Sequence, residues 1–203
     1  MLYDRDIREP LFEFLEEYYG KVRMIEEKRM GRSRADVMMI LPNAVCGLEI
    51  KSDADTYARL NRQVLDYNLY CDYNFIVAGT RHAHHVAEHV PDWWGIVTVE
   101  SEEDRVDFYV LRQPEENPNM DWKKKMSLLW RPELAHIQEV NQMPGYRGKS
   151  KQFVIEKILL KVPKHKLYAQ ISQELFERDY TIIEEQIRNY KKSSSKIIGS
   201  VRD

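Results

Sequence analysis

The feature that most constrains the fold is the stretch 34–67, in which charged side chains interrupt two apolar runs. Asp36 opens the first run, a Pro-Asn pair ends it, and the second run closes with Glu49 and Lys51. Two short apolar runs separated by such a pair predict two adjacent strands. Residues two apart in a strand share a face, so Glu49 and Lys51 should point together while Ile50 faces the opposite layer. Carboxylates and an ammonium group at a buried sheet are costly to desolvate, which favours a divalent cation as their partner.

The composition is that of a folded protein. Of 203 residues, 43% are hydrophobic and 32% are charged, which excludes a disordered polymer. No apolar run approaches the roughly 18 residues of a membrane span, and the charged N-terminus lacks the apolar core of a signal peptide. Cys46 and Cys71 have neither metal-ligand spacing nor a disulfide framework. We therefore expect a cytoplasmic protein with two buried thiols and no membrane partner.

Charge is unevenly distributed along the chain. Residues 1–120 hold 14 Lys and Arg against 23 Asp and Glu, whereas residues 121–203 hold 17 against 10. The acidic part contains the candidate metal site, and the basic part could hold a polyanion. A charge excess also serves simple solvation, so the asymmetry alone is a weak signal.

The order of apolar patterns in the first 113 residues predicts an α/β fold. Helices are expected at 4–19, 55–70 and 81–90, and strands at 21–30, 36–41, 44–51, 73–78, 96–99 and 105–111. The long helix between the strands ending at 51 and beginning at 73 indicates a parallel crossover. The result is a mixed central sheet flanked by helices.

The proline-rich, polar segment 113–121 marks a boundary. We expect a core over residues 1–113 and an all-helical, basic extension over residues 121–203. The helices predicted in that extension are 122–130, 132–140, 149–162, 163–176 and 179–191.

The charged residues of the central stretch carry a family resemblance. Asp36, Glu49-Ile50-Lys51 and a following Gln63 resemble the motif of the PD-(D/E)XK nuclease superfamily, which has the restriction-endonuclease-like fold. The chain is more similar still to small bacterial and phage members that carry RAD…EIKS and then a helix ending in Gln and Tyr. The resemblance covers roughly residues 5–111 and includes the PDWWG segment at 91–95. Ala35, where the motif has proline, is the one departure.

This resemblance implies metal-dependent hydrolysis of DNA. Asp36, Glu49 and the carbonyl of Ile50 would hold Mg²⁺ or Mn²⁺ through hard oxygen ligands. Lys51 would orient or deprotonate the attacking water and offset charge on the phosphate. Gln63 would position water or the strand backbone.

Many members of the superfamily add an earlier glutamate. Glu27 fits if residues 21–30 form a strand, and Glu13 or Glu17 fits if the ligand comes from the first helix; Glu27 ranks slightly first. Apart from the resemblance, Asp36, Glu49 and Lys51 could equally be a buried ion pair with a spectator carboxylate.

The other candidate motifs favour bland interpretations. His82, His84, His85 and His89 are predicted on one short helix, and the last two have the i, i+4 spacing of a metal pair. No glutamate completes an H-E-x-x-H motif, which favours a solvated helix face. The pair Trp93-Trp94 is expected to anchor packing under the sheet.

The C-terminal part offers a second DNA-binding candidate. Residues 129–162 are distantly similar to SAP-type helix-extended-helix modules, in which a lysine-rich turn meets phosphates. The contacts would be Lys123, Lys124, Lys125, Arg147, Lys149 and Lys151. A helical bundle that caps the core or forms a homodimer explains the same pattern equally well.

The sequence therefore predicts a Mg²⁺-dependent deoxyribonuclease that acts in phage or mobile-element biology, repair or defence, with DNA favoured over RNA as its partner. The alternative is a catalytically silent DNA-binding or protein-interaction module that retains the fold. An intact set of Asp36, Glu49 and Lys51 favours the enzyme.

Overall fold

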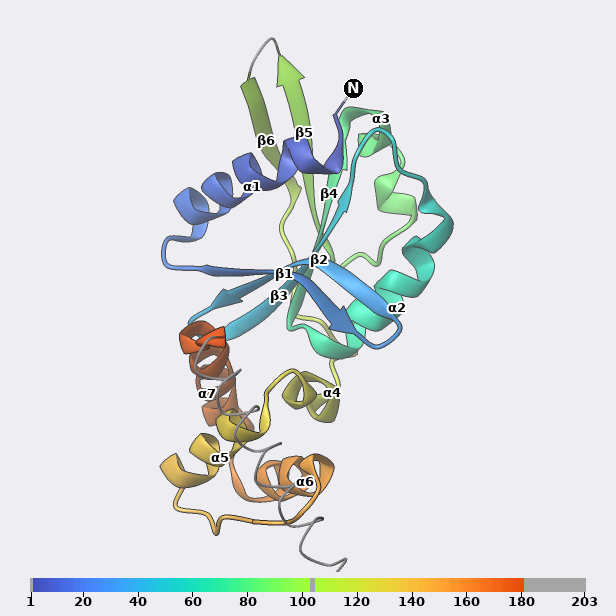
Figure 1. Ribbon diagram of the computed structural model, residues 1–203. Helices are drawn as coiled ribbons and strands as arrows, with labels where there is room; N and C mark the ends of the chain where they lie inside the picture. Colours follow the sequence, from blue (N-terminus) through green and yellow to red (C-terminus); the bar gives the residue numbers. More distant parts are fainter. Residues whose placement is uncertain (1, 103–104, 181–203) are drawn as a thin grey trace, which may run out of the picture.

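A six-stranded mixed sheet forms the centre of the protein (Figure 1). The structure, a computed structural model, describes residues 2–102 and 105–180. The strands are β1 (Arg23–Met30), β2 (Ser33–Leu41), β3 (Ala44–Lys51), β4 (Tyr73–Gly79), β5 (Gly95–Glu102) and β6 (Arg105–Arg112), and they lie in chain order across the sheet. β3, β4 and β5 pair in parallel, while β1–β2, β2–β3 and β5–β6 are antiparallel. The predicted α/β class with a mixed sheet is confirmed.

Helices cover both faces of this sheet. They are α1 (Asp4–Tyr19), α2 (Leu60–Tyr70), the short α3 (Thr80–Ala83), and the C-terminal α4 (Trp122–Ser127), α5 (Arg131–Val140), α6 (Lys151–Lys161) and α7 (Lys164–Glu177). There are also two single-turn 3₁₀ segments. The first, η1 (Tyr57–Arg59), precedes α2, and the second, η2 (Val86–Glu88), follows α3. The helix expected from residue 55 therefore starts as a 3₁₀ turn. The segment after residue 180 of the expected helix 179–191 lies outside the described residues.

Two apolar clusters lie on the two faces. In the α1-side cluster, Ile7, Leu11 and Leu15 of α1 pack on Val37 and Met39 of β2. In the α2-side cluster, residues from α2 pack on the other face together with apolar side chains from α4, α5, α6 and α7. The C-terminal helices therefore share one apolar core with α2 and the sheet.

The polar segment before α4 is also fixed to the core. Asn117 is buried, and its side-chain amide donates to the main-chain carbonyls of Asn68 at 2.8 Å and Cys71 at 2.7 Å. Its own backbone N–H donates to the carbonyl of Asp72 at 2.8 Å. The segment that connects the sheet to the C-terminal helices is thus fixed to the core by hydrogen bonds.

The alternation of side chains along β2 changes phase at Asp36. Ala35 and Met38 belong to the α2-side cluster, whereas Val37 belongs to the α1-side cluster, although strict alternation would put residues 35 and 37 on one face. Opposite Asp36, Glu27 of β1 has a positive φ of 54°, which non-glycine residues rarely adopt. The change of phase leaves the Asp36 carboxyl at the rim of the sheet rather than within either apolar layer.

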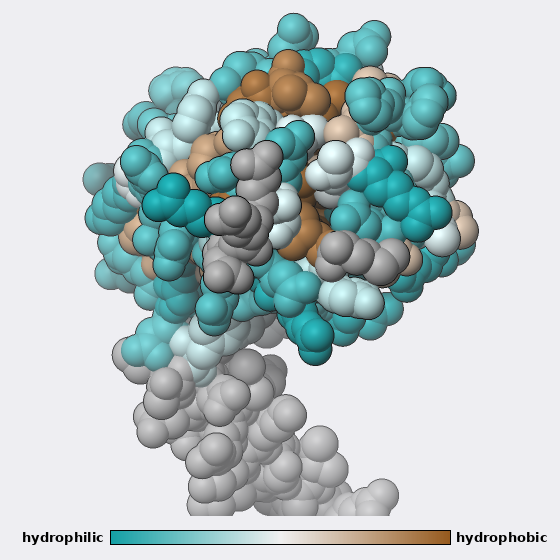
Figure 2. Space-filling model, turned by 90° about the horizontal axis from the view of Figure 1, so that it is seen from above, coloured by the Kyte–Doolittle hydropathy of each residue, from teal (hydrophilic) through white to brown (hydrophobic). Residues whose placement is uncertain are grey.

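Hydrophilic residues cover most of the end of the molecule viewed in Figure 2. Within the described ranges, none of the helices combines the length and apolarity that crossing a bilayer requires.

Candidate functional site

Glu49 and Lys51 lie at the end of the fully buried strand β3. Glu49 is 1% exposed and Lys51 3% exposed, and the Lys51 Nζ donates to Glu49 Oε1 at 2.6 Å. Gln63 of α2 donates its side-chain amide to the same oxygen and accepts from Lys51 Nζ at 3.3 Å. The Tyr67 hydroxyl lies 2.8 Å from Glu49 Oε2. Both side chains point to α2 from alternate positions of one strand, as their spacing predicts, so helix and strand together fix the ammonium group.

Asp36 faces the same place from the neighbouring strand. Its Oδ2 accepts the backbone N–H of Ile50 at 2.8 Å, and its own N–H donates to the Tyr67 hydroxyl at 3.1 Å. Burial, with repulsion from Glu49 as the next cause, raises the pKa of Asp36 to about 7. Burial also raises the pKa of Tyr67 well above its usual value, which keeps this phenol protonated. Tyr67 therefore bridges the two carboxyl-bearing residues as a neutral hydrogen-bonding group.

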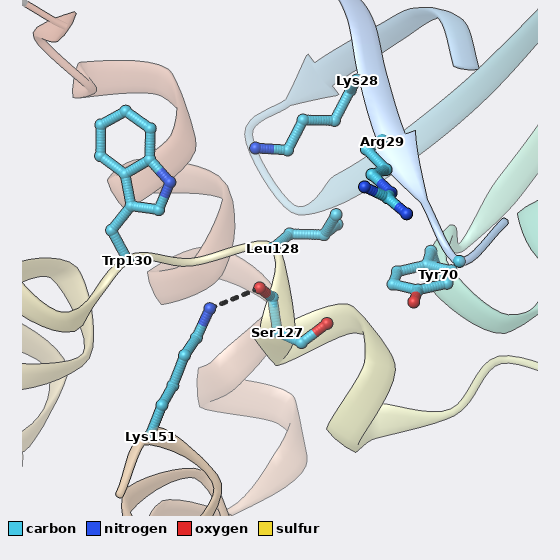
Figure 3. Close-up of a pocket in the computed structure, with 8 residues that line it drawn as sticks. Lys28, Arg29, Tyr70, Ser127, Leu128, Trp130 and Lys151 are labelled. Atoms are coloured by element: carbon cyan, nitrogen blue, oxygen red, sulfur yellow. Dashed lines mark hydrogen bonds between the residues drawn. The ribbon is translucent and has the colours of Figure 1, made fainter. Parts of the chain in front are cut away.

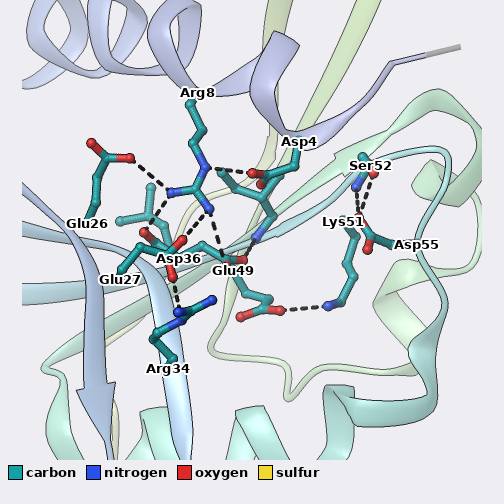
Figure 4. A network of polar contacts seen from close by, with 12 residues as sticks. Asp4, Arg8, Glu26, Glu27, Arg34, Asp36, Glu49, Lys51, Ser52 and Asp55 are labelled. Carbon is teal, nitrogen blue, oxygen red and sulfur yellow. Dashed lines mark hydrogen bonds and ion pairs between the residues drawn. The ribbon is translucent and has the colours of Figure 1, made fainter.

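An arginine of α1 projects into the acidic rim (Figure 4). Arg8 binds Asp4 at 2.6 Å, Glu26 at 3.1 Å and Glu27 at 2.9 Å, and its guanidinium lies 3.8 Å from Asp36 Oδ1. The neighbouring carboxylates raise the pKa of Arg8 against the opposing effect of its burial. Sequence reasoning missed this residue; the only signal was the i, i+4 spacing of Asp4 and Arg8 on a helix.

These residues surround one cavity of about 230 Å³, the carboxylate cavity. Its lining includes Asp36, Glu49, Ile50, Lys51 and Gln63 together with Asp4, Arg8, Glu27, Arg34, Asp55 and Arg59. The structure thus brings the motif residues from β2, β3 and α2 to one place.

Of the three candidates for an earlier glutamate, Glu27 alone lines the carboxylate cavity, whereas Glu13 and Glu17 of α1 do not. Glu27 is held by Arg8 and by Arg34, which binds its other oxygen. Within residues 2–102 and 105–180, no three His, Cys, Asp or Glu side chains form a metal-holding group. Asp36 and Glu49 are the motif carboxyl groups that line the carboxylate cavity.

A second cavity of about 290 Å³, the arginine pocket, adjoins the first. Its lining includes Arg32 and Arg34, on either side of the first residue of β2, Arg59 at the end of η1, Arg62 in the first turn of α2, and Ser33. Asp36, Gln63, Arg34 and Arg59 line both cavities. Four guanidinium groups beside the carboxylate cavity provide a surface suited to phosphates.

The predicted DNA contacts of the C-terminal part lie in different surroundings. Lys125 is 0% exposed and binds both oxygens of Asp72, at 2.8 and 2.6 Å, so the prediction that it contacts DNA is wrong. Its ion pair anchors α4 beneath the sheet, because Asp72 also accepts the backbone N–H of Val45.

The remaining predicted contacts reach the surface. Lys124, Arg147 and Lys149 are exposed, and Lys123 is exposed but paired with Glu156 at 2.8 Å. Lys151, at the start of α6, is half-buried and donates to the carbonyl of Ser127 at 2.7 Å.

The four histidines do not share a helix. α3 ends at Ala83 and η2 spans only Val86–Glu88, so the predicted helix 81–90 is wrong and the i, i+4 pair is interrupted. His89 stacks on Tyr57 with ring centroids 3.9 Å apart. Trp94 is fully buried and donates its indole N–H to Asn68 at 2.8 Å, which confirms its expected packing role.

The chain matches, over residues 2–198, a family model described as Bacteriophage P4 protein cII. Among solved structures it is similar to the structure of Pyrococcus furiosus SfsA in complex with Ca²⁺, at 14% sequence identity and a TM-score of 0.35. That match covers 54% of this chain and 62% of the SfsA chain, so the chain spans less than two thirds of SfsA. A comparison with curated proteins gives no match.

Proposed function

The chain belongs to the family of bacteriophage P4 protein cII, and from the geometry of its site we propose that it is a metal-dependent deoxyribonuclease that hydrolyses phosphodiester bonds. Membership of a family described by a phage protein supports a role in phage or mobile-element biology.

One observation carries this proposal. A buried ammonium group, Lys51, is held between Glu49 and Gln63 in a cavity that Asp36 also lines. Burying these charges costs free energy that a purely structural strand would avoid with apolar residues. The raised pKa of Asp36 adds a carboxyl group whose charged form is poorly compensated by its surroundings.

The donor chemistry fits a divalent cation. The carboxyl group of Asp36 repels that of Glu49, and a cation between them would relieve this repulsion. Mg²⁺ needs only one or two protein carboxylates, because waters and substrate phosphates complete its shell. Asp36, Glu49 and the carbonyl of Ile50 would hold it. The bound cation would supply positive charge against the phosphate and help to ionise the attacking water.

The side chains have separate tasks in the reaction. A water oxygen forms a bond to phosphorus as the bond from phosphorus to the leaving sugar oxygen breaks; the proton that the water loses passes to solvent, and the leaving sugar oxygen takes up a proton from solvent. Lys51 would orient the water and offset charge that develops on the phosphate. Gln63 fixes the ammonium group through its carbonyl oxygen, and Tyr67 holds the second oxygen of Glu49. Arg59 and Arg34, which line both cavities, would bind the neighbouring phosphates.

Nicking of supercoiled plasmid in Mn²⁺ tests the proposal. The wild type should nick the plasmid, and Lys51→Ala should lose activity by on the order of 100-fold or more, as removal of a charge-stabilising group in other enzymes does. Lys161→Ala, which removes an exposed lysine of α6, is the matched control and should cut normally. Circular dichroism of each variant separates lost chemistry from lost folding. Equal nicking by wild type and Lys51→Ala would exclude the proposed chemistry.

A second candidate function is DNA binding without catalysis. It is favoured by the hydrogen bonds that already engage both Glu49 oxygens and by the Arg8 ion pairs that neutralise the acidic rim. In that case the wild type should retain DNA in a gel-shift experiment and leave it uncut in both Mg²⁺ and Mn²⁺.

A further inference from the structure

A third cavity lies between the β1–β2 hairpin and the C-terminal helices (Figure 3). This lysine pocket has a volume of about 350 Å³, and Lys28, Arg29 and Lys151 supply its charged side chains. Gly31, Tyr70, Ser127, Leu128 and Trp130 complete the lining, which contains no carboxylate. Three cations and no anion give the pocket a strongly positive potential.

The cations of the lysine pocket are poorly compensated by the protein. Within residues 2–102 and 105–180, the Lys28 ammonium has no hydrogen-bond or ion-pair partner and lies 5.9 Å from the centre of the Trp130 ring. Lys151 donates to a main-chain carbonyl rather than to a carboxylate. The acidic group that acts on both lysines, Glu133, is engaged by Arg178 through hydrogen bonds of 2.6 and 2.7 Å. Among the residues that the structure describes, the pocket therefore has no counter-ion of its own.

Desolvation adds to the cost of these charges. Burial, and then repulsion from Arg178, lowers the pKa of Lys28 to about 8, and burial likewise lowers the pKa of Lys151. A bound anion would remove this cost, because an opposite charge nearby favours the protonated amine.

The position of the lysine pocket indicates where such an anion would come from. Gly31 lines the lysine pocket and the next residue, Arg32, lines the arginine pocket, so the two cavities lie on either side of the tip of the β1–β2 hairpin. Along α2, Arg62 belongs to one cavity and Tyr70 to the other, a separation of about 12 Å at the rise of an α-helix. Basic side chains thus line cavities on both sides of the hairpin tip, where the Asp66 carboxylate of α2 accepts the backbone N–H of Arg32 and the hydroxyl of Ser33.

We propose that the lysine pocket binds a backbone phosphate of a nucleic-acid strand whose neighbouring segment occupies the arginine pocket. The inference rests on the proposed function for the identity of the polymer, and it adds a contact outside the catalytic centre. It also gives the β1–β2 hairpin, with its sequence KRMGRSR at residues 28–34, the task of guiding the strand between the sheet and the C-terminal helices.

Fluorescence anisotropy with a short labelled DNA strand in EDTA tests this inference, since binding is then measured without cutting. The double variant Lys28→Gln/Lys151→Gln should lose affinity by about tenfold at low salt. Its dependence of log affinity on log salt should be shallower by about one to two units, as expected for one or two lost phosphate contacts. Lys161→Gln, from the same helix as Lys151 but outside the pocket, should bind like the wild type.

The outcomes separate this inference from the proposed function. Wild-type affinity and an unchanged salt dependence in the double variant would overturn the inference, even if the protein cuts DNA. Lysine-dependent binding by a protein that cuts nothing in Mn²⁺ would support the inference and refute the nuclease. A third outcome would be chemical-shift changes at Lys28 and Lys151 on addition of inorganic phosphate, with a DNA affinity that is the same in the wild type and the double variant. This outcome would identify a free phosphate compound as the ligand and overturn the strand contact.

If the double variant fails to fold by circular dichroism, the single variant Lys28→Gln decides the matter. Its affinity should fall by roughly half the double variant's loss on a logarithmic scale, because one of two phosphate-facing charges remains. Unchanged affinity in this folded single variant would overturn the inference.

Discussion

Asp36→Asn should stabilise the metal-free protein at pH 8 and leave its stability unchanged at acidic pH. The folded state holds the pKa of Asp36 near 7, against 3.8 for an ordinary aspartate, chiefly because of burial. Its side chain is 21% exposed, so solvent screens this effect only partly. Asparagine keeps the shape of aspartate, and its carbonyl oxygen can accept the backbone N–H of Ile50 that Asp36 accepts at 2.8 Å.

The size and sign of the effect follow from proton linkage. A raised folded-state pKa means that the folded chain binds the proton more tightly, so this stability is complete below about pH 4 and is lost as pH rises to about 7. A pKa difference of roughly three, at about 1.36 kcal/mol for each tenfold change in proton affinity, gives about 4 kcal/mol as the upper limit of the loss. The folded-state pKa already includes the attraction of Arg8, 3.8 Å away, and solvent screening of the partly exposed carboxylate lowers the figure, so a gain of about 2 to 4 kcal/mol at pH 8 is expected.

Urea denaturation in EDTA at pH 4.5 and pH 8 measures this difference. The free energy of unfolding of Asp36→Asn should exceed that of the wild type at pH 8 and approach it at pH 4.5. Asp92→Asn, which removes a fully exposed carboxylate, is the control and should show no such pH-dependent gain. An Asp36→Asn protein that is less stable than the wild type at pH 8 would refute the linkage argument.

Three further predictions concern other parts of the structure. Lys125→Ala should lower the free energy of unfolding by about 3 to 5 kcal/mol in urea denaturation, since it leaves the buried Asp72 carboxylate unpaired; a loss below about 1 kcal/mol would contradict the buried ion pair. Gly47→Ala should cost about 1 to 3 kcal/mol in the same assay, because a Cβ there would lie 2.5 Å from an aromatic ring of α2, and unchanged stability would show that the site has room. Arg59→Gln/Arg62→Gln should weaken DNA binding in EDTA by about tenfold with a shallower salt dependence, measured by anisotropy, and a steeper or equal salt dependence would exclude phosphate contacts there.

The sequence was sufficient for the sheet and for the convergence of the motif residues. Apolar runs, turns and the period of two placed Glu49 and Lys51 on one face, and the helix pattern placed Gln63 in the helix that follows them. These are local properties, since each depends on residues within one strand or one helix.

The rim of the site depends on tertiary packing that no local pattern contains. Arg8 reaches Asp36 and Glu27 because of how α1 crosses the sheet, and the phase change at Asp36 requires a backbone at Glu27 that β propensity does not encode. The burial of Lys125 also depends on tertiary packing that no local pattern contains. This residue stands in a run of three lysines, and only the docking of α4 against Asp72 separates it from its solvated neighbours.

The helix α2 contacts both the carboxylate cavity and the C-terminal helices, which are far apart in the sequence. Its Gln63 and Tyr67 side chains bind Glu49, and its apolar side packs in one continuous core with α4 to α7. A rod held in this way cannot tilt at one end while staying still at the other. Any load applied to the C-terminal helices, such as tension from a long polymer, would therefore reach the hydrogen bonds around Glu49, and removing those helices would unseat the groups that orient it.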